Sequence, residues 1–483
     1  MRSKLTKVLH PICGRSMIGH VVTAAAFVHP QHVIAVVGNG REQVGPHILE
    51  QTPHALLAVQ ETQDGTGHAV QVAIEALRDA AGSTSGTVVV MAGDTPLLEG
   101  KTLVDLVAEH DGSGRAITIL TGRVADPVGY GRIIRDDAGE VAAIVEEKDA
   151  TPEQAAIHEI NSGIFAFDGD FLADALTRIT NDNAKGEYYL TDVVAIARED
   201  GRSVGAHRID DVMQIEGAND RAQLAGLAAE LNRRTLARWM KDGVTVVDPA
   251  STWVDVTVRL ARDVVLKPGV QMHGSTTVGE DAVIGPDCTL TDVVVGERAS
   301  VVRTHGSKAF IGADATVGPF AYLRPGTVLG VKGKIGTFVE TKNADIGDGA
   351  KVPHLSYVGD AEIGEGSNIG AGTIFANYDG VNKHRTKIGK HAKTGSNNTF
   401  VAPVEVGDGA VTGGGTLVRR NVPPGALAVS TGPQRNIERW VLRKREGSTA
   451  ADAAKTALEE SASSHTEQSE VVENADQGGQ SDQ

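Results

Sequence analysis

The pattern of hydrophobic positions changes once along the chain, and the two parts predict different architectures. Up to about residue 219, short apolar runs such as HVIAVVGN and TVVVMAGD alternate with helical spacing, as in GTGHAVQVAIEALRDAAG. Apolar runs of this length, bounded by Gly and Asp, are typical of strands in a largely parallel sheet that helices cover on both faces. This part is therefore predicted to be an α/β domain.

Beyond residue 245, an aliphatic residue followed by glycine returns about every six positions. The pairs are Val278-Gly279, Ile284-Gly285, Ile311-Gly312, Val317-Gly318, Ile363-Gly364, Ile369-Gly370 and Val406-Gly407. This period predicts a left-handed parallel β-helix of hexapeptide repeats, in preference to a glycine-rich set of ordinary strands. The segments HGSKAF and NYDGVNKHRTK interrupt the repeat, so extra residues are expected to loop out from the wall there.

Two further segments complete the predicted domain organisation. Residues 220–243 are rich in Ala, Leu and Arg without proline, which predicts one long helix between the domains. The polar, acidic end without aromatic residues predicts a disordered tail. The expected order is 1–219, an α/β domain; 220–243, a linker helix; 244–440, a β-helix; and 441–483, a tail.

Charge and composition narrow the partners and the compartment. A net charge of -16 and a pI near 5.5 argue against binding to nucleic acid or to an anionic membrane surface. No apolar run approaches the ~20 residues that span a bilayer, and the N-terminus has no secretory pattern. Cys13 and Cys288 are far apart and outside any metal-ligand spacing. These features indicate a soluble cytoplasmic protein in which any phosphate site is local.

Candidate chemistry in the second part centres on cations and one histidine. Arg324, Lys342 and Lys383 are expected on or beside neighbouring coils, and converging cations call for an anion such as a sugar phosphate. His354 can remove a proton near neutral pH from an amine that attacks a thioester. Taken singly, a histidine in a solenoid is more often structural and a lysine is usually a solvated surface residue.

Together these motifs resemble one bacterial enzyme family. The block HLSYVGDAEIG, NIGAGT and NYDG, with the α/β part before it, is similar to the bifunctional N-acetylglucosamine-1-phosphate uridylyltransferases and glucosamine-1-phosphate acetyltransferases of cell-wall precursor synthesis. The resemblance implies a Rossmann-like nucleotidyltransferase domain before the left-handed β-helix. It also implies a homotrimer whose acetyltransferase sites are shared between subunits.

For the β-helix, the resemblance assigns roles to individual residues. His354 would be the catalytic base, and glucosamine 1-phosphate would bind to Arg324, Lys342, Tyr357, Asn368 and Lys383. Acetyl-CoA would bind to Ala371, Asn377, Tyr378, Ser396 and Gly414. These roles suit the chemistry, because Arg324 can grip phosphate with two hydrogen bonds and Lys342 supplies a point charge. Backbone donors near Tyr378 and the Ser396 hydroxyl could stabilise the oxyanion that develops on the thioester.

The α/β part carries two motifs of its own. QETQDGTGHAV places a Gly-Thr-Gly turn at a predicted helix start, which suits a phosphate or a base edge, although an ordinary loop is equally compatible. Asp94 ends the apolar run VVVMAGD, at the edge where α/β sheets bind ligands. A carboxylate there suits Mg²⁺ on a nucleoside triphosphate, and a helix cap is the alternative.

The resemblance extends these motifs to a full nucleotide site. Asp94 and Asn219 would bind Mg²⁺, and the residues expected to bind UTP and the UDP-sugar are Lys7, Gln60, Gly65, Thr66, Gly93, Gly131, Glu146, Asn161 and Asn219. The implied reaction is in-line attack of the sugar 1-phosphate on the α-phosphorus of UTP, with release of pyrophosphate. Acetyl-CoA and UTP are thus the expected co-substrates.

The start of the chain departs from the family pattern. Members begin with a buried strand and a glycine-rich loop, L-A-A-G-x-G-T-R-M, and Met1 falls on the last residue of that pattern. Two expectations follow: the natural protein begins upstream, or this chain retains acetyl transfer alone. A non-catalytic scaffold is a third reading, but it would lack the set of His354, Lys342 and Arg324.

Overall fold

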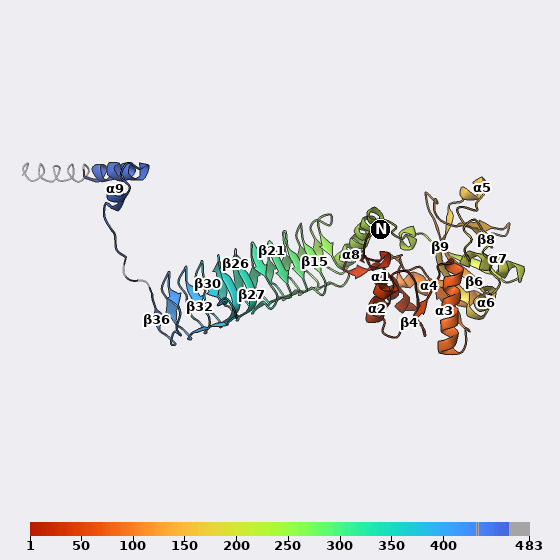
Figure 1. Cartoon of the computed structure of the whole chain (residues 1–483), viewed down its shortest axis with the longest axis horizontal. Helices are drawn as coiled ribbons and strands as arrows, with labels where there is room; N and C mark the ends of the chain where they lie inside the picture. Colours follow the sequence, from red (N-terminus) through yellow and green to blue (C-terminus); the bar gives the residue numbers. More distant parts are fainter. Residues whose placement is uncertain (431, 433, 463–483) are drawn as a thin grey trace, which may run out of the picture. The chain divides into compact units, whose positions relative to one another are not determined.

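The computed structural model describes residues 1–430, 432 and 434–462 (Figure 1). The chain divides into two compact units, Met1–Ala428 and Val429–Gln483. Among the described residues, no helix has the length and apolar character needed to cross a membrane.

A six-stranded mixed sheet forms the centre of the α/β part. Its order is β10-β6-β9-β7-β8, and β5 pairs with β9. The expectation of a largely parallel sheet is wrong here, because β9 runs antiparallel to β5, β6 and β7. The strands are β5 (Thr87–Val90), β6 (Ile117–Arg123), β7 (Arg132–Arg135), β8 (Val141–Val145), β9 (Glu159–Asp168) and β10 (Val204–Ile209).

Smaller sheets and helices surround this centre. β3 and β4 pair in parallel as a separate two-stranded sheet, and β1 and β2 form a short hairpin. These strands are β1 (Pro11–Ile12), β2 (Arg15–Ser16), β3 (Ile34–Val37) and β4 (Leu56–Val59). The α-helices are α1 (Met17–Ala25), α2 (Arg41–Gln51), α3 (Thr66–Ala81), α4 (Gly100–Ser113), α5 (Pro152–Ala155), α6 (Gly169–Ala175) and α7 (Val193–Glu199). The 3₁₀ turns are η1 (Lys7–Leu9), η2 (Ala26–Val28), η3 (Leu190–Asp192) and η4 (Val212–Ile215).

Helix α8 (Arg221–Lys241) lies within the predicted range 220–243. Its N-cap is Asp220, whose carboxylate accepts a hydrogen bond from the Gln223 N–H and so satisfies a free donor of the first turn. Leu227 packs in an apolar cluster of the α/β part, whereas Leu236 packs in the β-helix core. The helix therefore contributes to both cores.

The second part is a parallel β-helix with about 18 residues in a coil. Val265 pairs with Val283, and Val283 pairs with Ser300. One face contains β11 (Thr245–Val246), β14 (Val265–Leu266), β17 (Val283–Ile284), β20 (Ser300–Val301), β23 (Thr316–Val317), β26 (Lys334–Thr337) and β28 (Lys351–His354). We call it the first face. This coil length and the hexapeptide period are those of a left-handed β-helix.

The other strands pair as one run of seventeen and one further pair. The seventeen are β12 (Trp253–Val254), β13 (Arg259–Leu260), β15 (Gln271–His273), β16 (Thr277–Val278), β18 (Thr289–Thr291), β19 (Val294–Val295), β21 (Thr304–Ser307), β22 (Phe310–Ile311), β24 (Ala321–Leu323), β25 (Val328–Leu329), β27 (Glu340–Ile346), β29 (Tyr357–Ile363), β30 (Ile374–Ala376), β31 (Thr386–Ile388), β32 (Thr399–Val401), β33 (Val404–Val406) and β35 (Leu417–Val418). The pair is β34 (Val411–Thr412) with β36 (Leu427–Ala428).

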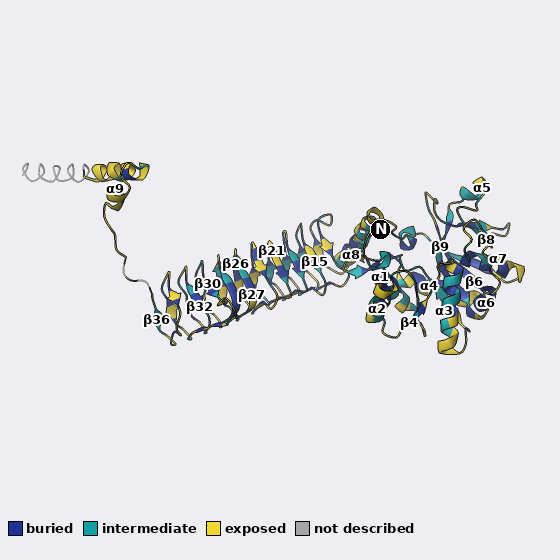
Figure 2. Cartoon of the chain, viewed as in Figure 1, coloured by how far each residue is buried: buried dark blue, intermediate teal, exposed yellow. Residues whose placement is uncertain are grey.

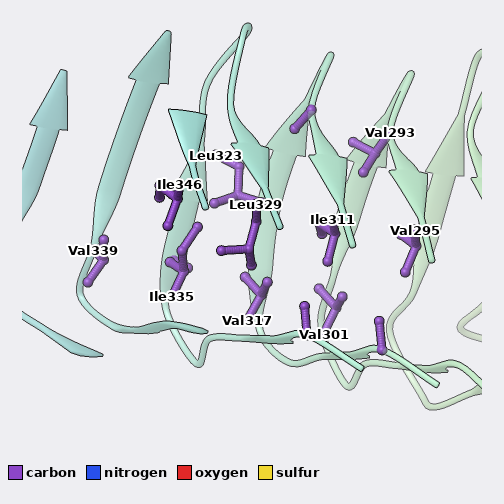
Figure 3. Close-up of a cluster of buried hydrophobic side chains, with 14 of the residues drawn as sticks. Val293, Val295, Val301, Ile311, Val317, Leu323, Leu329, Ile335, Val339 and Ile346 are labelled. Carbon is purple, nitrogen blue, oxygen red and sulfur yellow. The ribbon is translucent and has the colours of Figure 1, made fainter. Parts of the chain in front are cut away.

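Aliphatic side chains fill the interior of the β-helix. In most two-residue strands the first residue faces out and the second is buried, as in Val328 and Leu329 of β25. Figure 2 shows buried and exposed residues next to each other along the β-helix strands. Figure 3 shows Val295, Ile311, Leu329 and Ile346 stacked from coil to coil. Because each buried aliphatic side chain contributes roughly 1.5–3 kcal/mol, the stack makes the coils a rigid support.

The two interruptions of the repeat have opposite outcomes. At NYDGVNKHRTK the expected loop is confirmed, because Ile374 pairs with Thr399, 25 positions on, whereas Tyr357 pairs with Ile374, 17 positions on. We call residues 377–385 the insertion loop. The expectation of a loop at HGSKAF is wrong: those residues begin in β21, and Thr289 pairs with His305 only 16 positions on. That coil is short, so the repeat is broken by missing residues.

The expected disordered tail is in part helical. Within the described residues, α9 spans Trp440–Lys444, and residues 449–462 are also helical. The expectation of disorder is therefore wrong for these segments. The sequence TAADAAKTALEES explains why, since Ala, Leu, Glu and Lys are strong helix formers. The rest of the predicted tail, 463–483, lies outside the described residues.

Candidate active sites

In the α/β part, one lysine joins the two residues predicted to bind magnesium. The Lys7 Nζ atom lies 2.6 Å from Asp94 Oδ2 and 2.7 Å from Asn219 Oδ1. Lys7 lies in η1, Asp94 follows β5, and Asn219 precedes α8. The fold thus brings residues 212 positions apart to one point, and their oxygens converge on a single cation.

These two oxygens fit a small hard cation. In the part of the chain that the structure describes, no cluster of three or more His, Cys, Asp or Glu side chains could hold a metal alone. Magnesium commonly takes one or two carboxylate or amide oxygens and completes its shell with water and substrate phosphates. The residues present therefore fit Mg²⁺ that arrives with a nucleotide.

The Gly-Thr-Gly turn lies at the start of α3, as predicted. The Gln60 side-chain amide donates to the Gly65 carbonyl at 3.1 Å, and the Thr66 hydroxyl accepts from the Leu190 N–H at 3.1 Å. Gly65 has φ of +112°, and a Cβ there would lie 2.5 Å from the Tyr188 carbonyl oxygen. The turn is therefore closely packed against residues 188–190, and only glycine fits at position 65.

Gly131, Glu146 and Asn161 also come together. The Asn161 N–H donates to the Gly131 carbonyl at 2.8 Å, and a Cβ on Gly131 would lie 3.5 Å from Glu146 Oε1. Burial raises the pKa of the Glu146 carboxyl. Gly93 lies near α1, where a Cβ would approach Ile18 Cδ1 to 3.0 Å.

One short turn links these two groups. In η3, Leu190 contacts Thr66, while the Thr191 hydroxyl donates to Glu146 Oε1 at 3.4 Å. The Gly-Thr-Gly turn and the Glu146 group therefore share one wall. Sequence reasoning missed Thr191, because the segment YYLTD carries no motif that marks a site.

In the β-helix, the three predicted cations gather on successive coils and the insertion loop. Arg324 follows β24, and its N–H donates to the carbonyl of Thr341, the neighbour of Lys342 in β27. The ammonium of Lys342 lowers the pKa of Lys383, and the charge of Arg324 lowers it further. Lys342 and Lys383 are thus close enough to repel each other, as expected for a site that awaits an anion.

Acidic and amide side chains that sequence reasoning did not single out accompany these cations. Arg324 Nη1 lies 2.9 Å from Glu340 Oε1, and Lys342 Nζ lies 3.4 Å from Asp360 Oδ2. Asp360 also accepts hydrogen bonds from Asn343 and Asn377. Neither acid was predicted, because register across coils, and not spacing along the chain, places them here.

His354 lies on a line of backbone contacts that crosses several coils. The Gly372 N–H donates to the His354 carbonyl, the Asn397 N–H to the Ala371 carbonyl, and the Gly415 N–H to the Ser396 carbonyl. One edge of the β-helix therefore carries both the predicted base and three of the predicted acetyl-CoA residues, Ala371, Ser396 and Gly414. The His354 side chain is exposed there.

The remaining predicted residues divide between two places. Asn377 and Tyr378 lie at the start of the insertion loop; the Asn377 amide is 3.4 Å from the Tyr357 hydroxyl, and the Tyr378 hydroxyl donates to Gly380. Asn368 lies instead on the first face, bridged to Lys351 and Lys393. Within one chain the structure does not bring Asn368 to the cations.

Comparisons with known proteins show the family of the chain. A family described as "Nucleotidyl transferase" matches residues 2–257, which places the chain in the nucleotidyltransferase class. The "Bifunctional protein GlmU" of Rhodococcus jostii is 60% identical over 464 residues, covering 95% of this chain and 92% of the relative. The proteins of that name from Corynebacterium efficiens and Kineococcus radiotolerans are each 56% identical over 461 residues. They cover 95% of this chain, and it covers 94% and 93% of them.

The chain therefore belongs to the GlmU family of bifunctional transferases.

Proposed function

We propose that this chain catalyses two successive transfers in the synthesis of UDP-N-acetylglucosamine. The β-helix site transfers acetyl from acetyl-CoA to glucosamine 1-phosphate. The α/β site joins the product to the uridylyl group of UTP and releases pyrophosphate. The observation that carries this proposal is that one chain holds two separate charged sites, Lys7 with Asp94 and Asn219, and Arg324 with Lys342 and Lys383.

In the acetyl transfer, the cations hold the phosphate while His354 acts as the base. His354 removes a proton from the sugar amine, the amine nitrogen attacks the thioester carbonyl, and the coenzyme A thiolate leaves with the electron pair of the broken C–S bond. The Ser396 hydroxyl and backbone donors near Tyr378 stabilise the oxyanion that forms. The line of contacts from His354 to Gly414 gives acetyl-CoA an edge along which to lie.

In the uridylyl transfer, positioning and charge do most of the work. A phosphate oxygen of N-acetylglucosamine 1-phosphate attacks the α-phosphorus, and pyrophosphate leaves on the opposite side. Asp94 and Asn219 would hold Mg²⁺, which would neutralise charge on the phosphates. Lys7 adds a second positive charge, while Gln60, Gly65 and Thr66 bind the uracil. Gly131, Glu146 and Asn161 bind ribose, sugar and acetamido groups.

We also propose that three chains assemble around the β-helices in the cytoplasm. Phe320, Phe338 and Leu355 lie on one edge, exposed by 52%, 58% and 60%, and the two aromatic rings stack with centroids 5.3 Å apart. A trimer would cover this apolar ladder and would bring Asn368 of one subunit to the cations of another. The net charge of -16 supports small-molecule partners over nucleic acid or membrane.

The trimer is tested by Phe338→Asp. The buried carboxylate should convert the trimer to smaller species in light scattering and reduce acetyl transfer more than uridylyl transfer. Val128→Asp, at an exposed valine of the α/β part, should leave the mass unchanged. A Phe338→Asp variant that keeps the trimer mass would contradict the interface.

The two activities are tested by crossed substitutions. His354→Ala should lower release of free thiol from acetyl-CoA and glucosamine 1-phosphate by about 10²- to 10⁴-fold and leave pyrophosphate release unchanged. Asp94→Ala should do the reverse, with a loss of roughly 10²-fold or more. A variant that abolished both activities while remaining folded would refute the assignment of separate sites.

A further inference from the structure

Asp360 is a buried acid at the centre of the β-helix site. It lies in β29 directly after Gly359, and β29 pairs with β27, which carries Lys342 and Asn343. The residue is 8% exposed, and the backbone has φ of +48°. A buried carboxylate with left-handed backbone angles is costly unless its surroundings satisfy it.

Three donors from two segments, β27 and the insertion loop, satisfy this carboxylate. Oδ1 accepts a hydrogen bond from Asn343 Nδ2 at 2.8 Å, and Oδ2 accepts one from Asn377 Nδ2 at 2.5 Å. Lys342 Nζ lies 3.4 Å from Oδ2. Burial would raise the pKa of Asp360, but these hydrogen bonds and the Lys342 charge outweigh it and lower the pKa below its usual value. Asp360 is therefore the ionised hub of the site.

The hub determines which way the Asn377 amide faces. A carboxylate only accepts hydrogen bonds, so the NH₂ group of Asn377 must turn toward Asp360. The same NH₂ group reaches the Tyr357 hydroxyl at 3.4 Å. Both donor hydrogens are then engaged within the protein, which leaves Oδ1 as an acceptor. An acceptor at this position suits the amine of an amino sugar.

The backbone next to the Tyr357 and Asn377 side chains leaves no space for a Cβ at position 359. A Cβ on Gly359 would lie 2.3 Å from the Tyr357 hydroxyl oxygen and 2.8 Å from Asn377 Nδ2. Glycine at 359 thus permits the tyrosine and the asparagine to approach each other above Asp360. The arrangement does not depend on the carboxylate alone, because the shape of the coil also enforces it.

We propose that Asp360 is a positioning residue for acetyl transfer. It fixes the Asn377 amide so that Oδ1 accepts a hydrogen bond from the attacking amine, and it holds the Lys342 ammonium in the phosphate site. This role rests on the proposed function of the β-helix site. Asp360 itself touches neither substrate.

The first test is Asp360→Asn, which preserves size and tolerates left-handed backbone angles. The new amide opposes one of the two asparagine NH₂ groups and frees Lys342. We expect kcat/KM for glucosamine 1-phosphate to fall by about 10- to 100-fold, with a smaller change in KM for acetyl-CoA. Pyrophosphate release should be unchanged, which also shows that the variant is folded.

A swap of the two side chains separates positioning from general packing. Asn377→Asp alone places two carboxylates together and should be at least as damaging as Asp360→Asn. When both substitutions are combined, the amide and the carboxylate exchange places, and a hydrogen bond between positions 360 and 377 can form again. We therefore expect the double variant to be about tenfold or more active than Asn377→Asp. The proposal would be overturned if kcat/KM of the double variant did not exceed that of Asn377→Asp.

Asp292 provides the matched control. It also has positive φ, +55°, and its carboxylate accepts hydrogen bonds from Ser275 on another coil. Asp292→Asn should leave acetyl transfer within about twofold of wild type. If wild type transfers acetyl and Asp360→Asn keeps full kcat/KM, the positioning role alone fails. If wild type does not transfer acetyl to glucosamine 1-phosphate, the proposed function fails instead.

Discussion

The two sites gather their charges in different ways. In the α/β part, η1, the end of β5 and the segment before α8 converge so that Lys7 lies between Asp94 and Asn219. In the β-helix, register between neighbouring coils places Arg324, Lys342 and Asp360. The first site depends on the conformation of several loops, whereas the second depends on the packing of the β-helix coils. Substitutions should therefore affect binding in the α/β part and stability in the β-helix.

The largest effect is expected in the core that supports the second site. Leu329→Ala removes a fully buried side chain from β25 and should lower the free energy of unfolding by about 2–5 kcal/mol. The neighbouring Val328→Ala, at a 41% exposed outer position, should cost less than about 0.5 kcal/mol. Chemical denaturation measures both, and equal losses would contradict the view of the β-helix as a packed support.

A smaller effect should separate two glycines of the α/β part. Gly65 and Gly86 both have φ above +100°, but a Cβ collides with Tyr188 only at Gly65. Gly65→Ala should therefore raise KM for UTP by about tenfold, while Gly86→Ala should leave it unchanged despite similar backbone strain. Equal KM values for the two variants would show that the turn does not depend on its packing.

The smallest effect concerns the pH dependence of the cation cluster. Because Lys342 lowers the pKa of Lys383, phosphate binding should weaken as the pH rises toward that lowered pKa, below the usual lysine range. Lys342→Met removes this repulsion, so the alkaline rise in KM should move to higher pH even though KM itself is about tenfold larger. If KM rises at the same alkaline pH in wild type and in Lys342→Met, Lys342 does not lower the pKa of Lys383.

The repeat could be predicted from the sequence because one aliphatic residue per strand must face inward. Its interruption at HGSKAF was misassigned, since a broken period does not reveal whether residues are added or missing. The antiparallel direction of β9 could not be predicted, because a continuous buried run such as residues 164–167 reads the same in a parallel and in an antiparallel strand. Asp360 and Asn343 escaped notice because coil length and left-handed corners decide which side chains meet.

The central claim is that one chain carries two independent transfer sites. The most direct measurement mixes His354→Ala and Asp94→Ala proteins with glucosamine 1-phosphate, acetyl-CoA and UTP, and follows UDP-N-acetylglucosamine by chromatography. Each variant alone should form almost none, and the mixture should form it readily, because the acetylated sugar made by one variant diffuses to the other. A mixture as inactive as its components, or full product from either variant alone, would contradict this claim.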